Sequence, residues 1–139
     1  LNTLSRESTG DGAIIQQTCG ESAGLISGGS VIKQTFTGQA GDVLTFDWNF
    51  IGKDYRPCFN DFAFASIISP VVLSNIAVVG DFGRSGVQTF SFTIPTTGTY
   101  TLGLGVMNVG DVFYSPQFSS QLVVNQVKLL SSTPIIESI

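Results

Sequence analysis

The feature that most constrains this chain is the strong alternation in "DVLTFDWNF", residues 42–50, where only Val43 breaks the apolar–polar order. Side chains of an extended strand point alternately to its two faces, so the apolar members of this pattern share one face. They are Leu44, Phe46, Trp48 and Phe50. The same period recurs in residues 86–94 and 98–106. All three segments are therefore predicted to be strands with one buried face.

Further strands are predicted where short apolar runs are separated by Gly, Pro, Asn or Asp. These runs are residues 13–18, 31–37, 60–68, 71–79 and 121–130. About eight short strands without a helical stripe indicate an all-β fold, a single antiparallel β-sandwich, and this number favours a jelly roll. The length fits one domain over residues 1–139, with residues 1–12 and 131–139 expected as arms outside the core.

Charged residues are scarce, at 12% of the chain, whereas 42% of residues are apolar. Six basic residues against ten acidic ones leave no basic stripe to neutralise phosphates, so nucleic acid is not an expected partner. The uncharged residues 62–80 include Pro70 and Asn75, which favours two strands over membrane insertion. A surface with so little charge favours contact with copies of itself or with other surface proteins.

Two cysteines, Cys19 and Cys58, allow two interpretations. No CxxC pair and no histidine accompany them, which argues against a thiolate metal site. In an oxidising compartment a disulfide between them would remove about 4 kcal/mol of loop entropy from the unfolded chain. Two isolated buried thiols are the alternative. The chain begins at Leu1 without a methionine and is expected to be a processed form or a piece of a longer protein.

The chain contains no histidine, which removes the Ser-His-Asp and Cys-His nucleophiles and the usual general base near neutral pH. A carboxylate pair from Asp47, Asp54 and Asp61 is the remaining route to glycoside hydrolysis. However, Asp47 lies on the polar face of its strand, and Asp54 is expected with Arg56 in a solvated loop. Neither place gives a carboxyl group the environment of a catalytic acid. We therefore expect no enzymatic activity.

Aromatic faces beside amide or carboxylate groups are suited to binding sugars. One such set is Tyr55 with Asn60 and Asp61, and another is Tyr114 with Gln117. Alternation assigns most of the other aromatic residues to the core: Phe46, Trp48, Phe62, Phe64, Phe90 and Phe92. The two sets are therefore the candidate ligand-binding residues.

One polar residue departs from the pattern in "LVVNQVKL". Asn125 shares a predicted face with Val123 and Val127, so it is expected to be buried and to need hydrogen-bond partners. It would either tie two strands together or help line a site, and the tie is the simpler interpretation.

Several phrases together resemble a known family. They are "GDVLTFDWNF", "NDFAFASI", "GVQTFSFTIPTTGTYTLGLGVMNVGD" and "SSQLVVNQVKL". They are similar to a sandwich domain of secreted bacterial surface proteins, common in cyanobacteria and in proteins with a Pro-Glu-Pro sorting tail or hemolysin-type calcium repeats. The resemblance covers about residues 30–130 and implies a secreted, extracellular or cell-surface module that is not an enzyme.

The resemblance also bears on metal binding. Two positions that are usually aspartate in the family are Asn108 and Asn125 here. If those carboxylates bind a cation in relatives, the neutral amides would weaken the site. Asp61, Asp111 and Asn125 are then the calcium candidates, and we expect no metal and no other cofactor.

Two functions follow from these expectations. The first is a structural or adhesive surface module that assembles with copies of itself through its apolar ends, "LNTL" and "TPIIESI". The second end could bury its isoleucines as a strand on a neighbour's sheet edge, or it could fold back on its own domain or continue as a linker. The alternative function is a carbohydrate-binding jelly-roll module, an analogy from fold alone.

Overall fold

The computed structural model of the protein describes residues 26–56, 58–110 and 118–131. These residues form seven strands and one short helix. In chain order the elements are β1 (Ile26–Gly38), β2 (Val43–Ile51), β3 (Phe62–Ser66), β4 (Pro70–Asn75), α3 (Ile76–Val79), β5 (Gln88–Thr93), β6 (Gly98–Val109) and β7 (Gln121–Leu130). Every strand pair among them is antiparallel.

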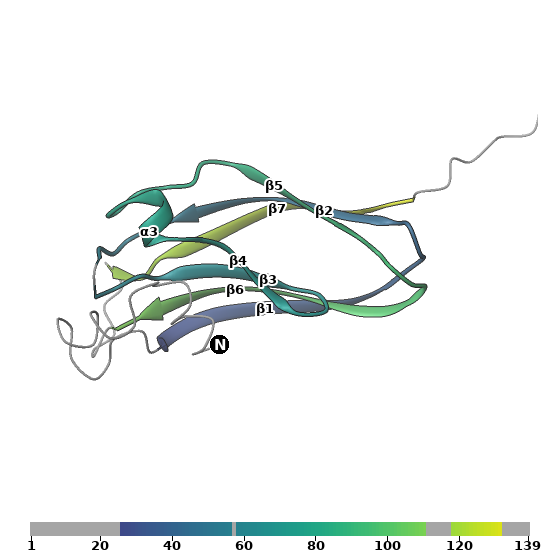
Figure 1. Cartoon of the computed structure of the whole chain (residues 1–139), viewed down its shortest axis with the longest axis horizontal. Helices are drawn as coiled ribbons and strands as arrows, with labels where there is room; N and C mark the ends of the chain where they lie inside the picture. The colour runs from purple at the N-terminus through teal and green to yellow at the C-terminus, as the bar shows by residue number, and fades with distance from the viewer. Residues whose placement is uncertain (1–25, 57, 111–117, 132–139) are drawn as a thin grey trace, which may run out of the picture.

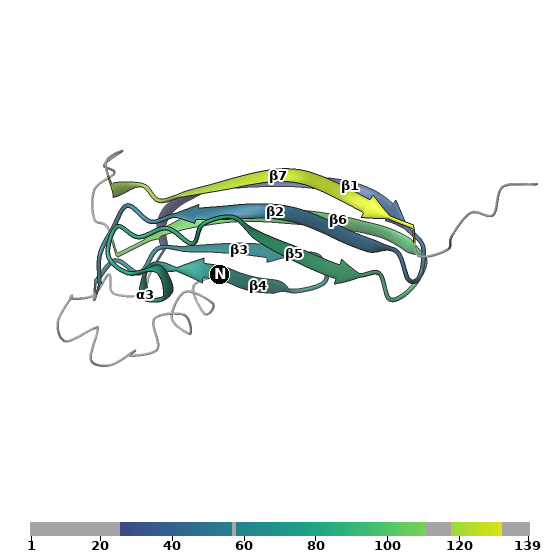
Figure 2. The same ribbon diagram turned by 90° about the horizontal axis from the view of Figure 1, so that it is seen from above.

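The strands build two sheets that pack face to face as an open sandwich (Figure 1). One sheet has the order β1-β6-β3-β4 and the other the order β5-β2-β7. Seen from above, β7 lies over β1 and β2 lies over β6 (Figure 2). The predicted all-β antiparallel sandwich is confirmed. An eight-stranded jelly roll is not established, because the described residues form sheets of four and three strands and the predicted strand 13–18 lies outside them.

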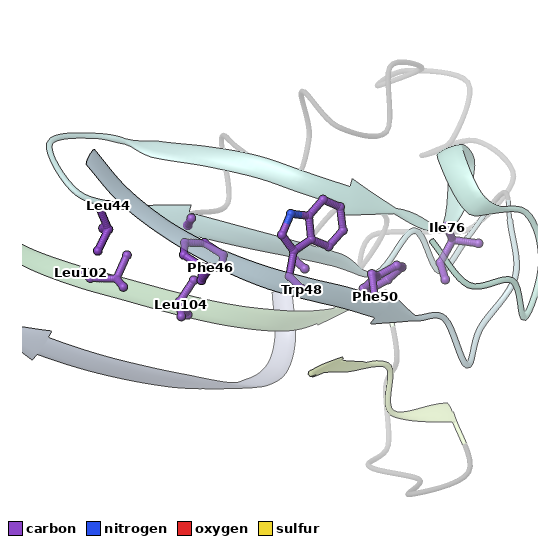
Figure 3. Close-up of a cluster of buried hydrophobic side chains, with 9 residues drawn as sticks. Leu44, Phe46, Trp48, Phe50, Ile76, Leu102 and Leu104 are labelled. Carbon is purple, nitrogen blue, oxygen red and sulfur yellow. The ribbon is translucent and has the colours of Figure 1, made fainter. Parts of the chain in front are cut away.

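The core between the sheets is built on β2, as its alternation predicts. All four of its inward side chains are at most 9% exposed, and Phe50 is completely buried. They pack against Leu102 and Leu104 of β6 and against Ile76 of α3 (Figure 3). Burying large side chains in this way removes apolar surface from water, which is the main favourable term in folding.

A second buried cluster lies on the other face of the four-stranded sheet. It consists of Phe62, Phe64, Met107 and Val109. The alternation of "FAFA" in β3 turns Ala63 and Ala65 toward β2, so the two phenylalanines point the opposite way. Phe62 and Phe64 are therefore buried, but they are not part of the core between the sheets.

The predicted strand 71–79 is divided in the structure. β4 ends at Asn75, whose side-chain Oδ1 accepts a hydrogen bond of 2.9 Å from the backbone N–H of Val78 and so caps the helical turn α3. Gly80 ends the turn with a φ of 89°. The run of Ile, Ala and Val has the composition of a strand, but the cap and the glycine select a turn instead.

Candidate functional site

Four polar side chains are buried at the end of the sandwich where β2 leads into β3. Asn60 and Asp61 are 0% exposed, Asp54 is 1% exposed and Ser120 is 6% exposed. Polar groups removed from water must find hydrogen-bond partners, and this requirement determines how the surrounding loops are held.

Asp61 joins three parts of the chain through its carboxylate. Its Oδ1 accepts a hydrogen bond of 2.9 Å from the backbone N–H of Val109, at the end of β6. Its Oδ2 accepts one of 2.7 Å from the hydroxyl of Ser120, just before β7. The same hydroxyl oxygen accepts a bond of 3.0 Å from the backbone N–H of Lys53.

Asn60 plays a similar part toward the helical turn. Its Oδ1 accepts a hydrogen bond of 2.8 Å from the backbone N–H of Ala77 in α3. The contacts of Asn60 and Asp61 are thus made to backbone and side-chain groups inside the fold. Both side chains are 0% exposed, whereas Tyr55 is 41% exposed, so the three residues do not share one exposed surface. Their part in ligand binding stays a prediction.

Asp54 does not lie in a solvated loop, and that expectation was wrong. Its Oδ1 accepts a hydrogen bond from the backbone N–H of Tyr55 at 3.0 Å. Its backbone carbonyl accepts another from Phe82 at 2.9 Å, and the N–H of Arg56 donates to Asp81 Oδ1 at 3.0 Å. The loop after β2 is thus held against the loop before β5, and this contact covers the Asp54 carboxylate.

Aromatic rings gather above these loops in what we call the loop aromatic cluster: Tyr55, Phe59, Phe82 and Phe118. The centroid of the Tyr55 ring lies 5.1 Å from that of Phe59 and 6.0 Å from that of Phe82. The Phe82 and Phe118 centroids are 6.4 Å apart. Tyr55 is 41% exposed and Phe82 is 54% exposed, so two rings of the cluster face solvent.

Sequence reasoning named only Tyr55 of this cluster and missed Phe59, Phe118 and Phe82, of which the most exposed is Phe82. Its backbone φ is 53°, a left-handed conformation that is rare for a bulky residue. Such conformations are found preferentially at functional sites, where surrounding contacts hold them in place. The available signal was the phrase "GDFGRSG", in which a single aromatic residue stands between glycines in an otherwise polar loop.

Several predicted site residues fall on parts of the chain that the structure does not describe. Tyr114, Gln117 and Asp111 lie outside the described residues, as does Cys19. Cys58 is disulfide-bonded.

The calcium candidates Asp61 and Asn125 are not brought together. Asp61 accepts a hydrogen bond from Ser120. Asn125 lies five positions after Ser120 along β7, and five residues of extended strand cover about 16 Å. Within the described ranges no group of three or more histidine, cysteine, aspartate or glutamate side chains could hold a metal ion.

Asn125 is exposed, so the expectation that it is buried was wrong. The register of β7 on β2 shifts between Asp47, which faces Asn125, and Thr45, which faces Lys128. Gln126, with a φ of 56°, lies in the resulting bulge. Before the bulge, Val124 pairs with the inward Trp48 and Asn125 pairs with Asp47 on the outer face. The extra residue reverses the alternation that follows it and moves Val127 toward the interior.

Among the described residues, no strand closes the side of the sandwich where β7 lies over β1 (Figure 2). A hollow of about 200 Å³ is lined there by residues of β1, β6 and β7, and it is continued by a second of about 100 Å³. Ile32, Leu104 and Val124 line both, so they form one surface that we call the edge groove. Lys33 and Gln34 also line it.

A membrane-spanning helix is not found among the described residues, whose helix α3 has four residues. No family model, curated protein or solved structure matches this chain. The resemblance to secreted bacterial sandwich domains therefore remains a prediction from the sequence.

Proposed function

We propose that this chain is a non-enzymatic, extracellular structural or adhesive module that associates with copies of itself through an open sheet edge. The observation that carries this proposal is β1. It has 13 residues, pairs only with β6 in the described part of the chain, and contains Lys33 as its single charged residue. A long edge strand exposes a row of backbone groups that can pair with another chain.

The other three edge strands carry features that oppose such pairing. β4 has six residues, begins with Pro70 and has a shifted register on β3. β5 also has six residues, and β7 contains the bulge at Gln126. By contrast, β1 pairs with β6 without a register shift from Gly28 to Gly38. Short strands, prolines and bulges are the usual means of blocking an edge, so β1 is the edge best suited to association.

One further observation supports an extracellular place for this module, and another supports its association. Cys58 is disulfide-bonded, and disulfides persist mainly in oxidising compartments. The scarcity of charge leaves exposed apolar side chains such as Ile32 and Val31, which are 66% and 49% exposed. Apolar residues gathered on one edge favour contact with another protein surface.

Sedimentation velocity over a wide concentration range tests the proposal, together with electron microscopy of the concentrated sample. We expect concentration-dependent association. Hydrogen exchange should show the amides of β1 becoming protected as association proceeds, because new backbone hydrogen bonds would form there. A strictly monomeric chain at high concentration would overturn the proposal.

A carbohydrate-binding function is the second candidate, and the loop aromatic cluster favours it. Tyr55 and Phe82 are exposed, and Phe82 is held in a left-handed conformation by the loop beneath it. Aromatic faces of this kind can stack on sugar rings. A glycan array would test it: binding should be lost in Phe82→Ala and kept in Val78→Ala, a control at an exposed apolar residue of α3. An array without hits would count against this function.

A further inference from the structure

The edge groove is a place where the buried core is left partly uncovered by the described strands. Leu102 and Leu104 at its base are 5% and 4% exposed, whereas Ile32 on β1 is 66% exposed and Val127 on β7 is 48% exposed. A strand laid along β1 would extend the four-stranded sheet and cover these rim side chains. It would also pair with the edge of β1 that has no partner strand in the described part of the chain.

We propose that the edge groove binds residues 135–138 of a second copy of this chain as a strand parallel to β1. This inference rests on the proposed self-association and names the segment that carries it. The segment, "IIES", contains two adjacent isoleucines and one charged residue, Glu137. It follows β7, which ends at Leu130.

Charge complementarity sets the register. Glu137 is the single charge of the segment, and Lys33 is the single charge of β1. In a parallel pair, residues at the same level share a face of the sheet. Placing Glu137 beside Lys33 gives these neighbours: Ile135 with Val31, Ile136 with Ile32, and Ser138 with Gln34. Apolar residues thus meet apolar ones, and Ile136 enters the groove.

The antiparallel arrangement with the same ion pair fits less well. It would place Ile136 beside Gln34 and Ser138 beside Ile32, so each apolar residue inside the groove would meet a polar one. Matched cross-strand pairs stabilise a sheet and mismatched ones do not. The parallel register is therefore the one that the side chains favour.

The strand must come from another copy. β1 and β7 run toward the same end of the sandwich (Figure 2), and Leu130 pairs there with Val43 at the start of β2. A parallel strand would have to begin beside Val31, seven residues or about 23 Å before the end of β1 at Gly38. The five Cα–Cα steps from Leu130 to Ile135 can span about 18 Å at most. The segment therefore cannot reach its own groove in this register.

Substitutions in the groove test the docking surface. In the full chain, Ile32→Lys and Val127→Lys should each weaken self-association by about tenfold or more in sedimentation velocity, because each places a charge where the added strand packs. The control is Val123→Lys on the outer face of β7, where Val123 is 42% exposed. It should leave association unchanged. Thermal melts should show that all three variants fold, since the replaced side chains are exposed.

A charge exchange tests the register. Lys33→Glu and Glu137→Lys should each weaken association by about three- to tenfold, and the double variant should recover most of the loss. Two independent losses that add, without recovery, would overturn the proposed register.

A substitution within residues 135–138 separates the proposed docking of this segment from the proposed self-association. If Ile136→Asp associates as well as the unchanged chain, the tail is not the docking strand, although self-association stands. If the unchanged chain is monomeric, self-association fails. Titration of the isotope-labelled Ile136→Asp chain with an end-capped synthetic peptide of residues 132–139 then decides the docking: shifts at Ile32 and Val124 support it, and their absence overturns it.

Discussion

At the scale of single residues, the Asp61 carboxylate links the end of β6 to the segment before β7. It is 0% exposed and accepts hydrogen bonds from the Val109 N–H and the Ser120 hydroxyl. Asp61→Ala would leave both donors buried without this acceptor. We expect the free energy of unfolding to fall by about 2–4 kcal/mol, measured by urea denaturation.

Two comparison variants test whether the loss of stability comes from the buried acceptor. Asp61→Asn keeps one carbonyl oxygen for Val109 and should lose less stability than the alanine variant. Asp47→Ala removes a carboxylate that accepts a bond from Thr89 on the exposed outer face of β2, and it should cost under about 1 kcal/mol. Equal losses for Asp61→Ala and Asp47→Ala would show that burial of Asp61 has no energetic importance.

Gly105 is a residue whose missing side chain makes room for an aromatic ring. A Cβ at this position would lie 2.5 Å from Cε1 of Phe64 and 3.2 Å from Cγ2 of Val31. Gly105→Ala should therefore displace the Phe64 ring and lower stability by about 1–3 kcal/mol. The matched control is Gly98→Ala, since a Cβ there meets nothing within 4 Å. If both substitutions have the same small effect in urea denaturation, the packing explanation is wrong.

At the scale of elements, the bulge in β7 makes a prediction with an unusual sign. Gln126 has a φ of 56°, which glycine adopts without steric cost and glutamine does not. Gln126→Gly should raise the free energy of unfolding by up to about 1 kcal/mol. Gln121→Gly, at the exposed start of the same strand, should instead lower it by about 0.5–1 kcal/mol. Denaturation curves that fall equally for both would contradict the strained bulge.

The same bulge explains what alternation could and could not predict. The pattern of β2 gave its buried face correctly, because both neighbours pair with it and one side faces the core. The pattern of β7 failed at Asn125, because the inserted residue after it reverses the faces of Val127 and Leu129, so Asn125 no longer shares a face with them. Likewise, residues 76–79 resemble a strand in composition, and only the flanking asparagine and glycine mark the turn.

In the loop after β2, the exposure of Tyr55 could be predicted from the sequence, but the burial of Asp54 could not. The exposed position of Tyr55 agrees with its place in a proline-containing loop. The burial of Asp54 depends on contact with residues 81–83, far along the chain, and no local pattern carries that information. The edge groove was also beyond prediction, since it is lined by residues of β1, β6 and β7 that lie far apart in the sequence.

At the scale of the whole molecule, the two ends and edges of the sandwich differ in character. The loop end is tied by hydrogen bonds of Asp54, Asn60 and Asp61, so its aromatic surface is supported from beneath. The side formed by β1 and β7 is open, with Ile32 and Val127 partly exposed above a buried base.

Cys58 lies at the end of the sandwich that holds Asp54, Asn60 and Asp61. Its disulfide allows a prediction about the stability of the whole fold. Cys58 is disulfide-bonded, and its backbone carbonyl lies so close to Gly110 that a Cβ there would fall 2.3 Å from it. Reduction releases a constraint on the unfolded chain, so the free energy of unfolding should fall by about 2–4 kcal/mol. Urea denaturation with and without reductant measures the change. Cys58→Ser serves as the control, because reductant should have no effect on it; equal midpoints for the unchanged chain under both conditions would refute the stabilising role.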